Sequence, residues 1–180
     1  MPKHQIFSAE TPNINTLLLE HARQVAVNAG KWLVQQRSNF SGIHYQCKKN
    51  HIDLVTEFDR NCEAMIIASI KERFPQHLIV SEEAASESLN LAKINQADEY
   101  CWVIDPLDGT MNFVHGIPHF AVSIGIVKNG QPVVGVVYDP NRDELFSAAS
   151  GLGVTMNEQK LTVSEQEEFG NSIINTGFSA

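Results

Sequence analysis

Residues 120–138 read Phe-Ala-Val-Ser-Ile-Gly-Ile-Val-Lys-Asn-Gly-Gln-Pro-Val-Val-Gly-Val-Val-Tyr. Two runs rich in β-branched residues flank Asn129-Gly130, and Asn-Gly between such runs is a strong signal for a β-hairpin. Outside this hairpin, Cys101–Ile104 before it and Glu144–Ala149 after it have the composition of further strands. The stretch therefore predicts a mainly antiparallel sheet.

Two long helices are predicted before the sheet. From Asn13 or Asn15 to about Gln36, apolar residues recur with the 3.6-residue period of a helix. A second apolar stripe begins near Asp59, and Pro75 ends it. Helices that come first, followed by strands in hairpins, predict an α+β fold with both helices packed on the sheet, not a doubly wound sheet.

The rest of the chain gives weaker signals. Residues 1–12 are polar and predict a loose arm, which leaves one domain over residues 13–180. The small, polar and acidic residues 84–98 predict a mobile connection. Short strands are expected at Gly42–Cys47, Leu78–Val80, Leu161–Val163 and Ser172–Asn175, with a turn at Gly151-Leu152-Gly153.

Composition narrows the class of protein. The 180 residues are 43% hydrophobic, and 13 Lys and Arg against 21 Asp and Glu give a net charge of 13 − 21 = −8. An acidic chain is a poor direct partner for nucleic acid, whose phosphates demand a cationic face. No apolar run approaches the ~18 residues of a membrane span, and the first residues lack a secretory pattern. We therefore expect a cytoplasmic protein that contacts neither membrane nor nucleic acid directly.

Cysteine usage agrees with that expectation. Cys47, Cys62 and Cys101 are odd in number and widely spaced, so neither a disulfide framework nor a structural zinc site is indicated. We expect them to be small buried apolar residues.

The chemistry concentrates in residues 102–110, which read Trp-Val-Ile-Asp-Pro-Leu-Asp-Gly-Thr. An apolar strand delivers Asp105, and Pro106 turns the chain because it cannot continue a strand ladder. Asp105 and Asp108 can then face one pocket with the Leu107 carbonyl between them. Two carboxylates and a carbonyl are hard-oxygen ligands suited to Mg²⁺.

An Asp-Pro turn followed by an Asp-Gly turn would explain the same residues without any function. Two further acidic clusters lie nearby in the predicted fold. Glu82-Glu83 follows another short apolar strand, although a solvated loop would explain it, and Asp59 lies at a predicted helix start, where an N-cap would explain it. Three acidic clusters at the ends of elements in one small domain favour a metal site, because cations would relieve the repulsion between them.

Several of these motifs together resemble the inositol monophosphatase family. They are Asp53-Leu54-Val55-Thr56-x-x-Asp59, Glu82-Glu83, Trp102–Phe113 (W-V-I-D-P-L-D-G-T-M-N-F), His119–Ser123 and Tyr138-Asp139-Pro140. The resemblance covers about residues 14–180. It implies a layered α/β sandwich and a Mg²⁺-dependent, lithium-sensitive phosphomonoesterase that hydrolyses inositol monophosphate to myo-inositol and phosphate. It also implies a small phosphorylated substrate and a homodimer.

The resemblance assigns the metal-binding roles. Glu82, Asp105 and the Leu107 carbonyl would bind one Mg²⁺, Asp105 and Asp108 would share a second, and Glu82 would reach a third ion through water. Lys48 would lie near the outermost of these two to three ions.

It also assigns the remaining roles. Asp59 and Thr110 would orient the attacking water. The phosphate would rest against the amides of Gly109 and Thr110, with Asp108 also touching a substrate hydroxyl. Glu83 would lie beside a metal-binding residue without touching the metal.

The sequence departs from the family pattern in three places. Ser81 replaces the usual Gly, and Met111 replaces a frequent Thr. Nothing after Asn175 resembles the family's W-D-x-A-A motif, whose Asp completes the second metal site. We therefore expect the C-terminal layers to be missing, one apolar face to be exposed, and this chain alone to be weakly active or inactive.

Other functions are compatible with parts of the pattern. A phosphatase with an Asp nucleophile uses D-x-D-G-T, whereas this chain has D-x-x-D-G-T and no Rossmann-like context. A non-catalytic regulatory protein associated with RNA or transcription through protein partners is a second alternative. A nucleotide 3′-phosphatase or a sugar bisphosphatase with the same acidic motifs is a third. His115 and His119 are better explained by turn and core roles than by acid–base chemistry.

Overall fold

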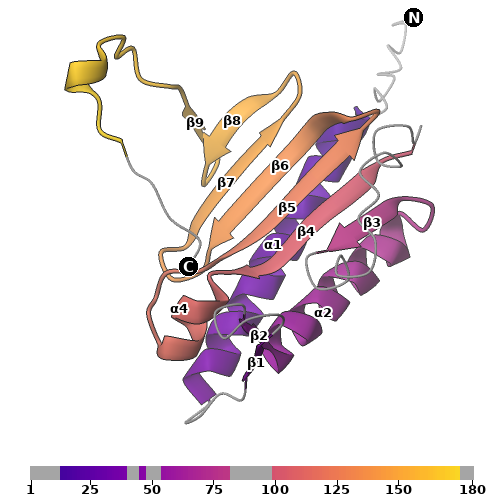
Figure 1. The fold of residues 1–180 in the computed structure, drawn as a ribbon. Coiled ribbons are helices and arrows are strands. Elements are labelled where there is room, and N and C mark those ends of the chain that lie inside the picture. Colours follow the sequence, from indigo (N-terminus) through magenta and orange to yellow (C-terminus); the bar gives the residue numbers. More distant parts are fainter. Residues whose placement is uncertain (1–12, 40–44, 48–53, 82–98, 175–180) are drawn as a thin grey trace, which may run out of the picture.

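A computed structural model describes residues 13–39, 45–47, 54–81 and 99–174 of the chain. Its elements are α1 (Ile14–Asn39), β1 (Tyr45–Cys47), β2 (Leu54–Thr56), α2 (Glu57–Arg73), β3 (Leu78–Ser81), β4 (Cys101–Asp108), α4 (Thr110–His115), β5 (Ala121–Lys128), β6 (Gln131–Asp139), β7 (Glu144–Ala149), β8 (Gly153–Met156), β9 (Gln159–Leu161) and a 3₁₀ turn, η2 (Phe169–Asn171). Figure 1 shows their arrangement. The architecture is the predicted mixed α+β fold.

The main sheet has seven strands in the order β3-β4-β5-β6-β7-β8-β9. Every neighbouring pair is antiparallel except β3 and β4, which are parallel. Asn129 and Gly130 form the turn between β5 and β6, both with positive φ, as the tight turn of a hairpin requires. The antiparallel sheet predicted from this turn is confirmed.

Both long helices cover one face of the sheet. α1 packs against β5, β6 and β7, α2 packs against β4, and the two helices contact each other (Figure 1). Alternate strand residues point toward the helices, since side chains in a strand alternate between its faces. The largest fully buried side chains of this core are Trp102, Tyr138, Phe113, Leu18, Leu33, Ile66, Ile70, Ile104, Leu107, Ile124, Ile126 and Val122. Within the described residues, the structure contains no helix apolar and long enough to cross a membrane.

The opposite face of the sheet is apolar and exposed. Val103, Val137, Phe146 and Val154 point to this face and remain 36–42% accessible to solvent. The expectation of an exposed apolar face is therefore met.

Some local predictions were wrong. Residues 153–156 form β8, where only a turn was expected, because Asn157 and Glu158 adopt positive φ and make a hairpin turn without glycine. The last short strands also differ: β9 ends at Leu161, and residues 172–174 are not a strand. Figure 1 shows the chain leaving the sheet after β9, and Ile173 is fully exposed, so an apolar sequence alone did not produce a strand there. The arm 1–12, the connection 84–98 and residues 42–44 and 175 lie outside the described residues.

Gly30 allows α1 to approach the sheet closely. A Cβ at this position would lie 2.6 Å from Cδ1 of the buried Tyr138 ring and 3.1 Å from Cβ of Pro140. We expect Gly30→Ala to lower the free energy of unfolding by about 2 kcal/mol, because an overpacking cost near ~3 kcal/mol is offset by ~1 kcal/mol of helix propensity. Urea denaturation measures this change. Gly135→Ala is the control, since its Cβ would meet nothing within 4 Å, and equal stabilities of the two variants would contradict the close approach.

Two partly buried histidines pack around Phe74 and Trp102. Trp102 Nε1 donates to His77 Nδ1 at 3.0 Å, and His77 stacks on Phe74 with ring centroids 4.8 Å apart. His21 Nε2 lies 3.1 Å from the Ser69 carbonyl oxygen. Burial lowers the pKa of His77 and the pKa of His21 from the ordinary value of 6.5. Lys71 lowers the pKa of His77 further, and Glu99 opposes this.

We expect the protein to lose stability as the pH falls below about 6.5. Above that pH both histidines are neutral in the folded and unfolded chains, whereas below it the unfolded chain takes up protons that the folded chain resists. Urea midpoints between pH 8 and pH 5 measure the effect. His77→Asn keeps an acceptor for Trp102 but cannot titrate, so its profile should be flatter than that of the wild type. A wild-type slope in His77→Asn would contradict the prediction.

Candidate active site at the carboxyl end of β4

The prediction that the strand ends at Ile104 and that Pro106 turns the chain was wrong, because β4 continues through Pro106 to Asp108. Residues 105–110, called the turn below, are the irregular end of β4 and its junction with α4. The pairing of β4 with β5 shifts register between Asp105 and Asp108, because proline has no N–H to give to the ladder. Oδ1 of Asp105 accepts the Leu107 N–H at 3.1 Å. Pro106 and Leu107 are buried, Asp105 is half-buried and Asp108 is exposed. The turn thus anchors its apolar residues in the core and leaves its two carboxylates near the surface.

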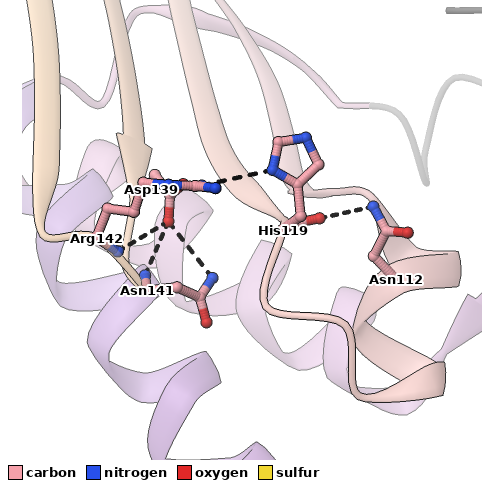
Figure 2. Close-up of polar contacts among 5 residues, drawn as sticks. All are labelled: Asn112, His119, Asp139, Asn141 and Arg142. Carbon is pink, nitrogen blue, oxygen red and sulfur yellow. Dashed lines mark hydrogen bonds and ion pairs between the residues drawn. The ribbon is translucent and has the colours of Figure 1, made fainter.

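Gly109 is required by the backbone that follows. Its φ is +94°, and a Cβ there would lie 3.0 Å from the His119 carbonyl oxygen. The same oxygen accepts a hydrogen bond from Asn112 Nδ2 at 2.7 Å (Figure 2). Gly109 leads directly into the short helix α4, which was not predicted, because six residues are too few to show a helical period. Arg37 of α1 donates from Nε to the Phe113 carbonyl oxygen at 2.9 Å near the end of α4.

Thr110 connects the turn to α2. Its Oγ1 lies 2.8 Å from Oδ1 of Asp59 and 3.0 Å from the Leu107 carbonyl oxygen. Asp59 is only 1% exposed. The helix begins at Glu57, two residues earlier than predicted, so Asp59 lies inside the first turn and is not the N-cap. The Thr110 hydroxyl is therefore the polar group between the buried carboxylate and the turn.

Two further contacts of α2 near the site were not predicted from the sequence. Sγ of Cys62 donates to the Pro106 carbonyl oxygen at 3.3 Å. The hydroxyl of Ser81, at the end of β3, donates to the Glu63 carboxylate. Cys62 was expected to be an apolar residue, and it is buried as expected, but only the tertiary fold brings it to a carbonyl 44 residues away.

A second polar cluster lies at the same end of the sheet, where β6 ends (Figure 2). Asp139 accepts hydrogen bonds from the Arg142 side chain and from the Asn141 amide N–H, the latter at 2.9 Å. Burial alone would raise the pKa of Asp139, but these hydrogen bonds outweigh it and lower the pKa. Arg142 also lies 3.5 Å from Nδ1 of the exposed His119. The Asp139 carboxylate therefore accepts hydrogen bonds from residues of its own turn.

The structure brings together six of the predicted site residues. Asp105, Leu107, Asp108, Gly109 and Thr110 lie in one turn, and Asp59 reaches it through Thr110. The other three, Lys48, Glu82 and Glu83, lie outside the described residues.

The described residues supply only part of a ligand set for a hard cation. Carboxylate oxygens of Asp105 and Asp108 and the Leu107 carbonyl are suitable ligands for Mg²⁺. Within the described ranges, no three His, Cys, Asp or Glu side chains form a group that could hold a metal. The donor chemistry thus fits Mg²⁺, with Glu82 as the predicted additional ligand.

The chain is similar in fold to solved structures and in sequence to curated proteins. A solved structure of an IMPase from Thermotoga maritima superposes with a TM-score of 0.71 at 34% identity, over 82% of this chain and 54% of that one. Inositol monophosphatase 1 of Solanum lycopersicum is 40% identical over 159 residues, which are 88% of this chain and 57% of the relative. Nus factor SuhB of Xylella fastidiosa is 33% identical over 170 residues, 94% of this chain and 57% of the relative.

The sequence model of the inositol monophosphatase family matches residues 15–180. The chain therefore belongs to the inositol monophosphatase family, as its motifs predicted. It spans somewhat more than half the length of these relatives.

Proposed function

We propose that the protein is a Mg²⁺-dependent phosphomonoesterase that hydrolyses inositol monophosphate to myo-inositol and phosphate. The observation that carries this proposal is the hydrogen-bonded connection from buried Asp59 through Thr110 to the Leu107 carbonyl, beside the carboxylates of Asp105 and Asp108. Family membership supports a phosphatase, while the substrate and the ion are our proposal.

The metal-binding residues are Asp105, Asp108, the Leu107 carbonyl and Glu82, with Lys48 and Glu83 nearby. Bound Mg²⁺ supplies a lowered pKa for a coordinated water and stabilises charge on the leaving oxygen. It also supplies the positive field that lets a chain of net charge −8 bind an anionic substrate.

Asp59 and Thr110 act on the attacking water. The Thr110 hydroxyl donates toward Asp59 and the Leu107 carbonyl, so the lone pairs of Oγ1 remain to accept a hydrogen bond from a water in front of the turn. Because Asp59 is almost fully buried, it orients and polarises Thr110 and does not contact the water itself. No side-chain nucleophile is needed.

The phosphate rests against the amides of Gly109 and Thr110 at the start of α4, where backbone N–H groups have no partner inside a helix. Asp108, which is exposed, touches a hydroxyl of the substrate. We further propose a cytoplasmic protein, inhibited by lithium, that forms a homodimer.

The test is phosphate release from myo-inositol 1-phosphate by the 180-residue chain with Mg²⁺ and with EDTA. A nucleoside 3′-phosphate and fructose 1,6-bisphosphate serve as competing substrates. We expect slow release that needs Mg²⁺ and prefers the inositol ester. Release that persists in EDTA would contradict the metal mechanism, and faster release from another ester would assign the substrate to that class.

A regulatory role is the second candidate. It is favoured by relatives named Nus factor SuhB and by the exposed apolar face of the sheet, which a protein partner could bury. A phosphatase role requires Asp105, whereas binding through that face would survive Asp105→Asn. Direct binding of RNA is not proposed, given the acidic charge.

A further inference from the structure

Cys62 and Asp105 are hydrogen-bonded to opposite sides of one peptide unit, the one between Pro106 and Leu107. The carbonyl of Pro106 accepts the thiol of Cys62 at 3.3 Å, and the N–H on the other side of that peptide bond, from Leu107, donates to Oδ1 of Asp105 at 3.1 Å. A peptide unit is planar and rigid, so its two ends turn together. The orientation of the Asp105 carboxylate is thereby coupled to a contact from α2.

The next peptide of the turn is also held. The Leu107 carbonyl oxygen lies 3.0 Å from Oγ1 of Thr110, which shares its one hydroxyl hydrogen between this oxygen and Oδ1 of Asp59 at 2.8 Å. Asp59 and Cys62 lie three residues apart on α2, which places them on one face of the helix. Two successive carbonyls of the turn are therefore fixed from neighbouring positions of one buried helix face.

The thiol stays protonated in this position. Cys62 is fully buried, and its burial and the negative charges of Asp59, Asp105 and Glu63 raise its pKa to about 12. A thiol with this environment is a permanent hydrogen-bond donor and a poor nucleophile. The nearby carboxylates that suppress ionisation are the same groups that surround the candidate site.

We propose that Cys62 is a positioning residue for the metal-binding turn: its thiol fixes the Pro106–Leu107 peptide and, through it, the direction of the Asp105 carboxylate. This inference rests on the proposed metal site. It gives Cys62 no contact with substrate or metal.

The inference is tested without any assay of activity by measuring Mn²⁺ binding to the 180-residue chain. The electron paramagnetic resonance signal of the free ion reports how much Mn²⁺ is bound. Cys62→Ala should weaken Mn²⁺ binding by about 10-fold, within the range found when groups supporting metal ligands are removed. Cys62→Ser restores a donor and should recover binding to within about threefold. Cys101→Ala is the matched control. Cys101 is buried like Cys62, but it lies at the start of β4, at the far end of the strand from Asp105. This variant should bind Mn²⁺ like the wild type.

The hydrogen bond itself has a spectroscopic signature. The infrared difference between the wild type and Cys62→Ala isolates the S–H stretch of Cys62, which should lie below that of Cys101 and shift when Mn²⁺ is added. Circular dichroism checks that each variant is folded. If Cys62→Ala does not fold, Cys62→Ser is compared with the wild type instead. In either comparison, a Cys62 S–H band at the same frequency as that of Cys101 would overturn the inference.

The two proposals fail in different ways. Unchanged Mn²⁺ binding in folded Cys62→Ala overturns the positioning role alone. Absence of Mn²⁺ binding by the wild type overturns the proposed metal site and the positioning role with it.

Discussion

Asp105→Asn is expected to reduce Mg²⁺-dependent phosphate release by 100-fold or more. Asparagine keeps the shape of the side chain and an oxygen that can accept the Leu107 N–H, so the turn should remain folded. It removes one negative charge from the donor set, and a loss of about 2.7 kcal/mol of transition-state stabilisation corresponds to ~100-fold in rate. The same variant should bind Mn²⁺ more weakly, because a neutral amide oxygen is a poorer ligand for a hard cation.

The control for this variant is Asp139→Asn. Asp139 lies at the same end of the sheet, but its hydrogen bonds go to Asn141 and Arg142 in its own turn. It should retain phosphate release to within about threefold of the wild type, because these hydrogen bonds lie within its own turn and away from Asp105. Equal losses in the two variants would show that acidity at this end of the sheet matters in general, and the assignment of Asp105 as a ligand would be lost.

The hairpin and part of the site turn were predictable because their signals are local. Asn129-Gly130 identifies its turn through backbone conformations that few residues adopt. Gly109 likewise acts locally, whereas Pro106 does not end the strand as predicted: β4 continues to Asp108 with a shift of register between Asp105 and Asp108. The strand at 153–156 was missed because Asn157-Glu158 makes a positive-φ turn without glycine.

The contacts of α2 were not predictable in the same way. The apolar stripe predicted that Cys62 would be buried, but the thiol finds its acceptor only when α2 packs on β4. Asp59 could be explained as a helix cap from sequence alone, and only the observed start of α2 at Glu57 excludes that reading. Local patterns thus located the acidic residues, whereas packing of the helix on the sheet determined how they are held.

Thr110→Val is expected to lower kcat by about 100- to 1,000-fold, the range for loss of a positioned proton-transfer group. Valine has nearly the shape of threonine but cannot connect Asp59 to a water, and the Leu107 carbonyl loses its contact with the hydroxyl. The carboxylates of Asp105 and Asp108 remain, so binding of Mn²⁺ should weaken less than in Asp105→Asn. Thr110→Ser keeps the hydroxyl and should keep most of the activity.

Asp59→Asn and the double variant with Thr110→Val show whether the two residues act as one unit. Residues that serve a single step give strongly non-additive losses, so the double variant should be about as slow as Thr110→Val alone. Because Asp59 is 1% exposed and is hydrogen-bonded to Thr110, we expect its effect on the water to pass through Thr110, and Asp59→Asn should add little once the hydroxyl is gone. Independent, multiplying losses would instead mean that Asp59 supports the site by another route, such as the stability of α2, and urea denaturation of the single variants would show that loss directly.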